Sequence, residues 1–166
     1  MARTQRISAC LWFDGKAQEA VQFYTSVFDD SKILRTSRYT EVGRETHGQT
    51  PGSVMTVEFE LDGVPFTALN GGPQFKFNEA ISLQVLCDTQ AEIDRYWKSL
   101  GEGGDPKVQQ CGWLKDRFGV SWQITPADLD ELMSDSDSER AGRVMRALLE
   151  MKKLDIAALR RAHTGR

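Results

Sequence analysis

Histidine is scarce in this sequence, and its cysteines follow no metal-binding or disulfide pattern. The chain of 166 residues has two histidines, His47 and His163, and three cysteines, at positions 10, 87 and 111. The cysteines form no CxxC pair and leave an odd thiol, so we predict neither a zinc site nor a disulfide framework. Free thiols are typical of a reducing compartment, and we expect a cytoplasmic protein.

Long apolar runs and an excess of positive charge are also missing. No stretch approaches the roughly 18 apolar residues of a membrane span, and the first residues lack the apolar region of a signal peptide. The net charge is −3, from 21 basic and 24 acidic side chains. This balance argues against a basic nucleic-acid-binding protein. We expect neither a membrane nor a nucleic-acid partner, and a core that forms without metal or disulfides.

The first part of the chain alternates strand and helix patterns. A strand is predicted at Ile7–Phe13, and a helix at 16–28, where apolar residues recur with the helical period. The polar, glycine-containing stretch 41–53 is predicted to be a loop. Three further strands are predicted near residues 33–39, 55–61 and 64–69.

Residues 78–126 repeat this order in a shorter form. They contain a predicted strand at Ile81–Cys87, a helix near 91–100, and strands near 107–114 and 120–125. Two βα units, each followed by strands, favour an α+β fold over a doubly wound parallel sheet. We therefore predict a globular part over residues 1–126, made of two modules at about 5–75 and 78–126.

The charge changes abruptly after residue 126. Residues 127–139 carry six acids and no base, whereas 140–166 carry eight bases and two acids. Ser136–Glu139 fits a capping box, and the apolar stripe Val144, Leu148 and Met151 follows at helical spacing. Residues 127–166 are predicted to be a helical extension, whose last helix is capped by Asp155. Because this stripe has no evident partner in the two βα units, it must be buried either on the chain's own core or on a second subunit, and we expect a homodimer.

Strand parity predicts one polar face in the second module. The polar side of its first and last strands carries Ser82, Gln84, Ser121 and Gln123. This side either meets water or lines a concave polar cleft. The strand at Ala9–Phe13 is largely apolar on both sides, so we expect both sides to be buried, which favours the cleft.

Six segments, in order along the chain, carry a family resemblance. They are Leu11–Gly15, Ala68–Pro73, Phe77–Ser82, Cys111–Asp116, Val120–Ile124 and Met151–Ile156. Together they resemble the PhnB-like, or 3-demethylubiquinone-9 3-methyltransferase-like, branch of the vicinal oxygen chelate superfamily, which includes glyoxalase I, extradiol dioxygenases and fosfomycin-resistance proteins. The resemblance implies two βαβββ modules that form a curved sheet around a cleft, in a homodimer.

Enzymes of this superfamily hold a divalent metal ion through His, Glu, His and Glu on four strands. The resemblance places these positions at or beside Ala9 and Phe66, and at Ser82 and Gln123. Alanine, phenylalanine and serine are not normal ligands of divalent metals, and glutamine is a weak neutral one. We therefore expect no metal site, and no other cofactor.

Catalytic candidates are few. Cys111 precedes Gly112-Trp113 but has no neighbouring histidine to activate it, so a plain strand-edge thiol is the simpler interpretation. Glu79 is either a general base, if a cleft raises its pKa, or a surface acid. The glycine pair in Asn70–Pro73 is a turn of positive φ more readily than a nucleotide-binding loop, so S-adenosylmethionine binding is not expected.

The candidate ligand-binding residues carry amide, hydroxyl or indole groups. They are Asn70, Ser82, Gln84, Trp113, Ser121 and Gln123. Amides and hydroxyls bind neutral polar molecules by hydrogen bonds but are poor acid–base catalysts, and Trp113 either walls a pocket or packs in the core. We predict a protein that binds a small organic molecule in a polar cleft without a metal. Three alternatives stay open: a metal-independent lyase or isomerase, the methyltransferase that the family name suggests, and an interaction protein whose tail docks a partner.

Overall fold

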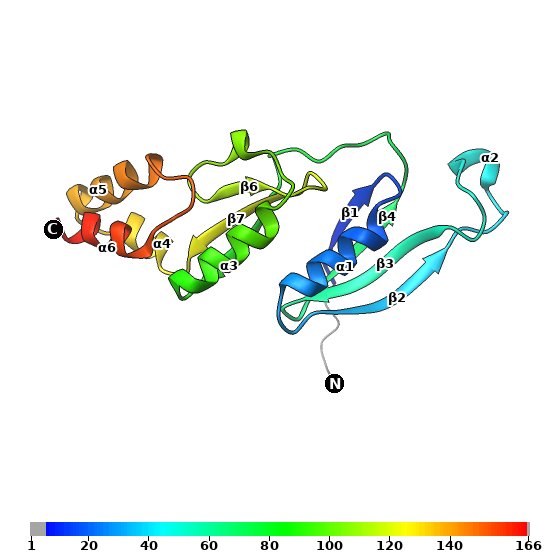
Figure 1. Ribbon diagram of the computed structural model, residues 1–166, viewed down its shortest axis with the longest axis horizontal. Coiled ribbons are helices and arrows are strands. Elements are labelled where there is room, and N and C mark those ends of the chain that lie inside the picture. Colours follow the sequence, from blue (N-terminus) through cyan, green and yellow to red (C-terminus); the bar gives the residue numbers. More distant parts are fainter. Residues whose placement is uncertain (1–5, 166) are drawn as a thin grey trace. The chain divides into compact units, whose positions relative to one another are not determined.

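The computed structural model describes residues 6–165, which form two compact units that meet in sequence between Phe77 and Asn78. Figure 1 labels most of their elements. The first unit contains β1 (Ala9–Phe13), α1 (Ala17–Val27), β2 (Lys32–Arg38), α2 (Arg44–His47), β3 (Val54–Leu61) and β4 (Val64–Asn70). The second contains β5 (Leu83–Cys87), α3 (Gln90–Gly101), the 3₁₀ helix η1 (Pro106–Val108), β6 (Trp113–Lys115), β7 (Ser121–Pro126), α4 (Leu129–Met133), α5 (Ser138–Leu149) and α6 (Ile156–Thr164).

The first unit is a four-stranded sheet with α1 on one face. The strand order is β1-β4-β3-β2, with β1 parallel to β4 and the other neighbours antiparallel. The start of α1 has no side-chain cap of its own at Lys16. Instead the Ala17 N–H donates to Asn70 Oδ1 at 2.8 Å, and Asn70 Nδ2 donates to the Val54 carbonyl at 3.0 Å. The Asn70 amide thus joins the helix to the sheet.

The burial of β1 differs from the expectation. Leu11 and Phe13 are buried, but Cys10, on the opposite side of the strand, is exposed. Trp12, on the same side as Cys10, is half-buried. The prediction that β1 is buried on both sides is therefore wrong for the described chain, because α1 covers one face of the sheet and no described element of this unit covers Cys10 on the other.

The second unit has a smaller sheet, of order β5-β7-β6, with β5 parallel and β6 antiparallel to β7. Its buried face carries Leu114, Trp122 and Ile124, and α3 packs against all three strands. The long strand predicted near 107–114 is replaced by η1 and the short β6. Cys111 and Gly112 explain the change, since both have positive φ and an extended strand cannot continue through them. The α+β class is confirmed. The second module has three strands, one fewer than the βαβββ order that the resemblance implies.

The turn between β6 and β7 is organised by a buried carboxylate. Asp116 is 3% exposed. Its Oδ1 accepts hydrogen bonds from the backbone N–H groups of Phe118 (2.8 Å) and Val120 (3.0 Å), and its Oδ2 accepts one from Trp122 Nε1 (2.8 Å). From the sequence, Lys115-Asp116-Arg117 is only a charged turn, because the partners that bury Asp116 are visible only in three dimensions.

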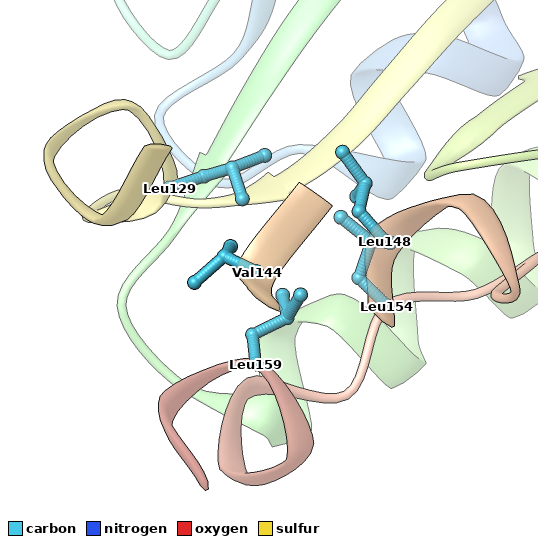
Figure 2. Close-up of a cluster of buried hydrophobic side chains, with 5 residues drawn as sticks. All are labelled: Leu129, Val144, Leu148, Leu154 and Leu159. Carbon is cyan, nitrogen blue, oxygen red and sulfur yellow. The ribbon is translucent and has the colours of Figure 1, made fainter. Parts of the chain in front are cut away.

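The C-terminal helices fold onto the second unit itself. Figure 2 shows Leu129, Val144, Leu148, Leu154 and Leu159 converging in one cluster, and all five are buried. Of the two alternatives for the stripe of Val144 and Leu148, the chain's own core is the one observed: α4, α6 and the segment before α6 cover it. The last helix is capped by Asp155 as predicted, through the Ala158 N–H at 2.7 Å. The cap of α5 is Asp137, one residue after the predicted Ser136.

Hydrogen bonds tie this helical segment to the rest of the second unit. The N–H groups of Cys111 and Gly112 donate to the carbonyls of Met151 (2.8 Å) and Lys152 (2.7 Å). The Gln90 side chain donates to the Leu154 carbonyl and accepts from the Ile156 N–H. Across residues 6–165, no helix has the length and apolar character needed to cross a membrane.

Asp116 provides a first stability test. We expect Asp116→Ala to lower the free energy of unfolding by about 3 kcal/mol, since three buried donors lose a charged acceptor. Urea denaturation measures the change. Asp105→Ala is the matched control, because Asp105 is exposed and accepts a single backbone hydrogen bond, from Lys107. Equal losses in the two variants would contradict the role of Asp116.

Candidate functional site

The second unit contains a pocket on the polar face of its sheet. Its volume is about 260 Å³. The residues that line it are Gln84, Leu86, Cys111, Trp113, Gln123, Thr125, Pro126, Ala127, Leu129, Asp130, Met133 and Leu148. They come from β5, from the β6–β7 hairpin and its approach, and from the helices that follow the sheet. All of them belong to the second unit.

Strand register explains why the polar side chains meet there. Gln84 lies beside Gln123 across β5 and β7, and Trp113 lies beside Gln123 across β6 and β7. Since successive side chains of a strand alternate between faces, these three lie opposite to Leu114, Trp122 and Ile124. Gln123 Nε2 donates to Ser82 Oγ at 2.7 Å, and Gln84 Nε2 lies 3.5 Å from Gln123 Oε1. Ser82, Gln84 and Gln123 therefore form one hydrogen-bonded row.

Two other candidate ligand residues are placed differently. Ser121 is buried, and its Oγ lies 3.5 Å from the Asn78 carbonyl, outside the pocket lining. Asn70 belongs to the first unit, is 6% exposed, and uses both ends of its amide to hold α1 and β3. The structure therefore gathers Gln84, Trp113 and Gln123 around the pocket, with Ser82 bonded to Gln123.

The Glu79 carboxylate is held in an ion pair. It pairs with Lys115, and the hydrogen bond from that ammonium, followed by one from the backbone, lowers the pKa of Glu79. A general base that works near neutral pH needs a raised pKa. The shift therefore runs in the opposite direction from the one that the base role requires.

The two thiols of the second unit, Cys111 and Cys87, have distinct environments. Cys111 lines the pocket, and its φ of 51° is unusual for a residue other than glycine. No histidine or lysine stands among the lining residues, so no partner is available there to activate this thiol. Cys87 is buried on the face of the sheet that α3 covers, where desolvation is the main cause that raises its pKa to about 11, and it stays protonated.

Several lining residues were not predicted from the sequence. Leu86 and Thr125 lie two residues after Gln84 and Gln123 on the same strands, so they share their face of the sheet. The two-residue period of the strands could therefore have predicted them. Leu129, Asp130 and Met133 come from α4, and Leu148 from α5. For these the sequence gives only a helical pattern and an acidic run, which do not indicate which surface the helices cover.

The positions that correspond to the superfamily metal ligands are adjacent in pairs. Ala9 and Phe66 are partners in the β1–β4 register of the first unit, and Ser82 and Gln123 are hydrogen-bonded in the second. In neither pair does a side chain offer a normal ligand for a divalent ion. Residues 6–165 contain no group of three His, Cys, Asp or Glu side chains that would hold a metal. The residues present do not fit the metal of the superfamily.

The two histidines are engaged elsewhere. His47 stacks against Tyr39, and its Nδ1 accepts the Gln49 N–H at 3.0 Å. His163 Nε2 lies 2.7 Å from Asp135 Oδ2. Neither lines the pocket.

The glycine pair after β4 has a packing role. A Cβ atom on Gly71 would lie 2.1 Å from Cζ2 of Trp12, so only glycine fits beneath that indole ring. Trp12 Nε1 donates to the Gly72 carbonyl at 2.9 Å, and Gly72 has a φ of 103°. The glycine pair thus allows the indole of Trp12 to pack directly against the backbone after β4.

Comparisons with known proteins agree with this fold. Residues 5–125 match the model of the family described as 3-demethylubiquinone-9 3-methyltransferase. A PhnB protein from Bacillus cereus that carries the same name is 40% identical, over 74% of this chain and 100% of its own, with a TM-score of 0.63. Among curated proteins, none matches the sequence.

Two more distant structures share the fold. Protein PA1353 from Pseudomonas aeruginosa is 20% identical over 74% of this chain and 98% of its own, with a TM-score of 0.56. The fosfomycin resistance protein FosX from Mesorhizobium loti is 15% identical over 80% of this chain and 99% of its own, with a TM-score of 0.55.

The fold and these relatives define a protein of the vicinal oxygen chelate superfamily. Within it, the chain belongs to the PhnB-like family, which bears the name 3-demethylubiquinone-9 3-methyltransferase. The resemblance found in the sequence is confirmed. The family match ends at residue 125, so the segment Met151–Ile156 and all three C-terminal helices lie outside it.

The metal positions lead to a second prediction. We expect purified protein to contain well under one divalent ion per chain, because Ala9, Phe66, Ser82 and Gln123 present no charged or imidazole ligand. Elemental analysis after dialysis against zinc, nickel and manganese measures the content. About one ion per chain that is lost in Ser82→Ala or Gln123→Ala would contradict the prediction.

Proposed function

We propose that this protein binds a small organic molecule in the pocket of the second unit, and that it does so without a metal ion or another cofactor. The observation that carries the proposal is the composition of the pocket. On one side of the pocket, the side-chain amides of Gln84 and Gln123 lie beside Trp113. On another side, α4 and α5 contribute apolar side chains to the lining. Pockets that combine an apolar wall with a few convergent polar groups are typical of small-molecule sites.

The volume limits the size of the ligand. An engineered apolar cavity of about 150 Å³ holds one benzene molecule, and pockets for drug-sized ligands begin near 300 Å³. A pocket of about 260 Å³ therefore suits one ring with a short polar arm. S-adenosylmethionine, which joins a nucleoside to an amino acid, is larger than such a ligand, so the pocket volume favours a smaller molecule over this cofactor.

The polar groups favour recognition by hydrogen bonds. A primary amide has two donor hydrogens and an acceptor oxygen with two lone pairs. The bonds within the row of Ser82, Gln84 and Gln123 use only part of this capacity. A carbonyl, hydroxyl or amide group of a ligand can bind to what is left. Neither glutamine takes up a proton near neutral pH, so the row orients a ligand and does not act as an acid or a base.

A metal-independent lyase or isomerase finds less support. Such an enzyme needs a proton acceptor beside its substrate. Glu79 is held as an ion-pair partner of Lys115, and no histidine or lysine in the pocket lining can activate Cys111. Asp130 is the one carboxylate of the lining, and no histidine, lysine or second acid accompanies it there to form an acid–base pair. The geometry favours binding over catalysis for these reasons.

The third prediction tests ligand binding with phenylacetamide, a neutral molecule of one ring and one amide. We expect it to shift the side-chain amide resonances of Gln84 and Gln123 in nitrogen–proton correlation spectra. Trp113→Ala should weaken binding about threefold to tenfold, because the ring loses an aromatic contact. Trp97→Ala is the matched control, since Trp97 is also half-buried but lies on α3, outside the pocket.

Calorimetry with S-adenosylmethionine completes this test. We expect no saturable binding at sub-millimolar concentration. One saturable site per chain would overturn the proposed function in favour of the methyltransferase.

We also propose that the protein is a homodimer, on a different ground from the apolar stripe of the tail. Each sheet ends in strands with an open edge: β1 and β2 in the first unit, β5 and β6 in the second. Open edges pair readily with strands of another chain. Ile81, next to β5, is 79% exposed, which adds apolar surface beside one such edge.

The fourth prediction follows from this edge. Multi-angle light scattering at tens of micromolar should give twice the chain mass of 18.7 kDa. Ile81→Asp should weaken the dimer, since a charge would be buried at the edge. Val42→Asp is the control, because Val42 is equally exposed but lies outside the strands. A monomeric wild-type protein would rule the dimer out.

A further inference from the structure

The helices that follow the family match complete the pocket. The match ends at residue 125, whereas α4 contributes Leu129, Asp130 and Met133 to the lining, and α5 contributes Leu148. Without these side chains, the row of Gln84 and Gln123 would lie on an open sheet face. The wall that encloses the pocket therefore comes from a part of the chain outside the residues that the family model matches.

We propose that this helical wall sets the selectivity of the pocket, and that Asp130 directs it to amphipathic molecules with one apolar ring and one cationic amine. The inference rests on the proposed function, because it names the ligand class of the same pocket. Its two parts are the fixed position of the wall and the charge that the wall carries.

The wall is held firmly in place. Leu129 and Leu148 line the pocket and also belong to the buried cluster with Val144, Leu154 and Leu159 (Figure 2). The bonds from Cys111 and Gly112 to the carbonyls of Met151 and Lys152 join the end of this helical segment to the approach of β6. A wall fixed by a core on one side and by backbone hydrogen bonds on another keeps a constant shape, which selectivity requires.

The charges around the wall single out Asp130. Among the acids of residues 127–139, Asp128 pairs with Arg160, Asp135 with His163, and Asp137 with Arg140. Within the described residues, Asp130, Glu131 and Glu139 have no ion-pair partner. Of these, Asp130, an exposed residue, lines the pocket, and it is the one charged residue of the lining.

A single carboxylate, with no basic group in the lining, attracts cations and hydrogen-bond donors and repels anions. Trp113 adds to this preference, because the face of an indole ring attracts cations.

Three matched probes test the charge selectivity. Phenethylamine, phenylacetamide and phenylacetate share one ring and differ in charge, as cation, neutral molecule and anion at neutral pH. Each is titrated into the full-length protein while the Gln84 and Gln123 side-chain amide resonances are followed. We expect the affinity to fall in the order amine, amide, carboxylate.

Three substitutions in α4 test which side chain causes the preference. Asp130→Asn should weaken binding of phenethylamine about twofold to fivefold, the range of a partly solvated ion pair, and leave phenylacetamide unchanged. Glu131→Gln, the matched control, removes a neighbouring acid that does not line the pocket and should change neither. Met133→Ala should weaken all three probes by similar factors, because it removes apolar wall but no charge.

The outcomes separate the two proposals. Binding of all three probes with equal affinity, or an Asp130→Asn variant that retains the wild-type preference, would overturn the selectivity of the wall and leave the proposed function standing. Absence of any shift with all three probes would overturn both. Preference for phenylacetate would show that the charge of Asp130 does not govern the pocket.

Discussion

The second unit depends on a reversal of the backbone at Cys111 and Gly112. Both residues have positive φ, and a Cβ on Gly112 would lie 2.9 Å from the Ile124 carbonyl oxygen. Their N–H groups bind the carbonyls of Met151 and Lys152, and the Gly112 carbonyl accepts the Ile124 N–H at 2.8 Å. Two residues thus hold β7, the start of β6 and the C-terminal helices together. The pocket exists because this reversal brings the helices beside the polar face of the sheet.

Neutral side chains give the row of Ser82, Gln84 and Gln123 its chemical character. At two of the positions that the family resemblance places at the superfamily metal, Gln123 donates a hydrogen bond to Ser82. That bond leaves further donors and acceptors of both side chains available to a ligand. Amides and hydroxyls bind a ligand through hydrogen bonds, which depend on direction and distance. No side chain of the row changes its charge near neutral pH. The family name, with its implied methyl transfer, finds no corresponding cofactor cradle around Gly71, where the indole of Trp12 packs.

The parts predicted well from the sequence depend on local periodicity. The shared face of Gln84 and Gln123 follows from the two-residue period of a strand, whatever the strand packs against. Asp155 was recognised as a cap because capping acts within one turn.

The parts that were left open or predicted wrongly depend on distant partners. The stripe on α5 was correct as a helix pattern, but the sequence did not decide what covers it, and in the structure α4, α6 and Leu154 of the same chain do so. The strand predicted near 107–114 is interrupted because Cys111 has a positive φ. Residues other than glycine rarely adopt this conformation, so a cysteine in the sequence does not indicate it. Asp130 was unrecognised because an acidic run does not reveal which of its members lines a pocket.

The Asn70 amide determines which segments of the first unit unfold together. Its amide links the first turn of α1 to the beginning of β3, so neither element can separate from β4 without exposing an unpaired buried polar group. Segments joined in this way exchange their amide hydrogens as one cooperative body, instead of fraying one after another. The Asn70 side chain therefore makes α1, β3 and β4 a single unit of local unfolding, although 53 residues separate it from the helix start that it caps.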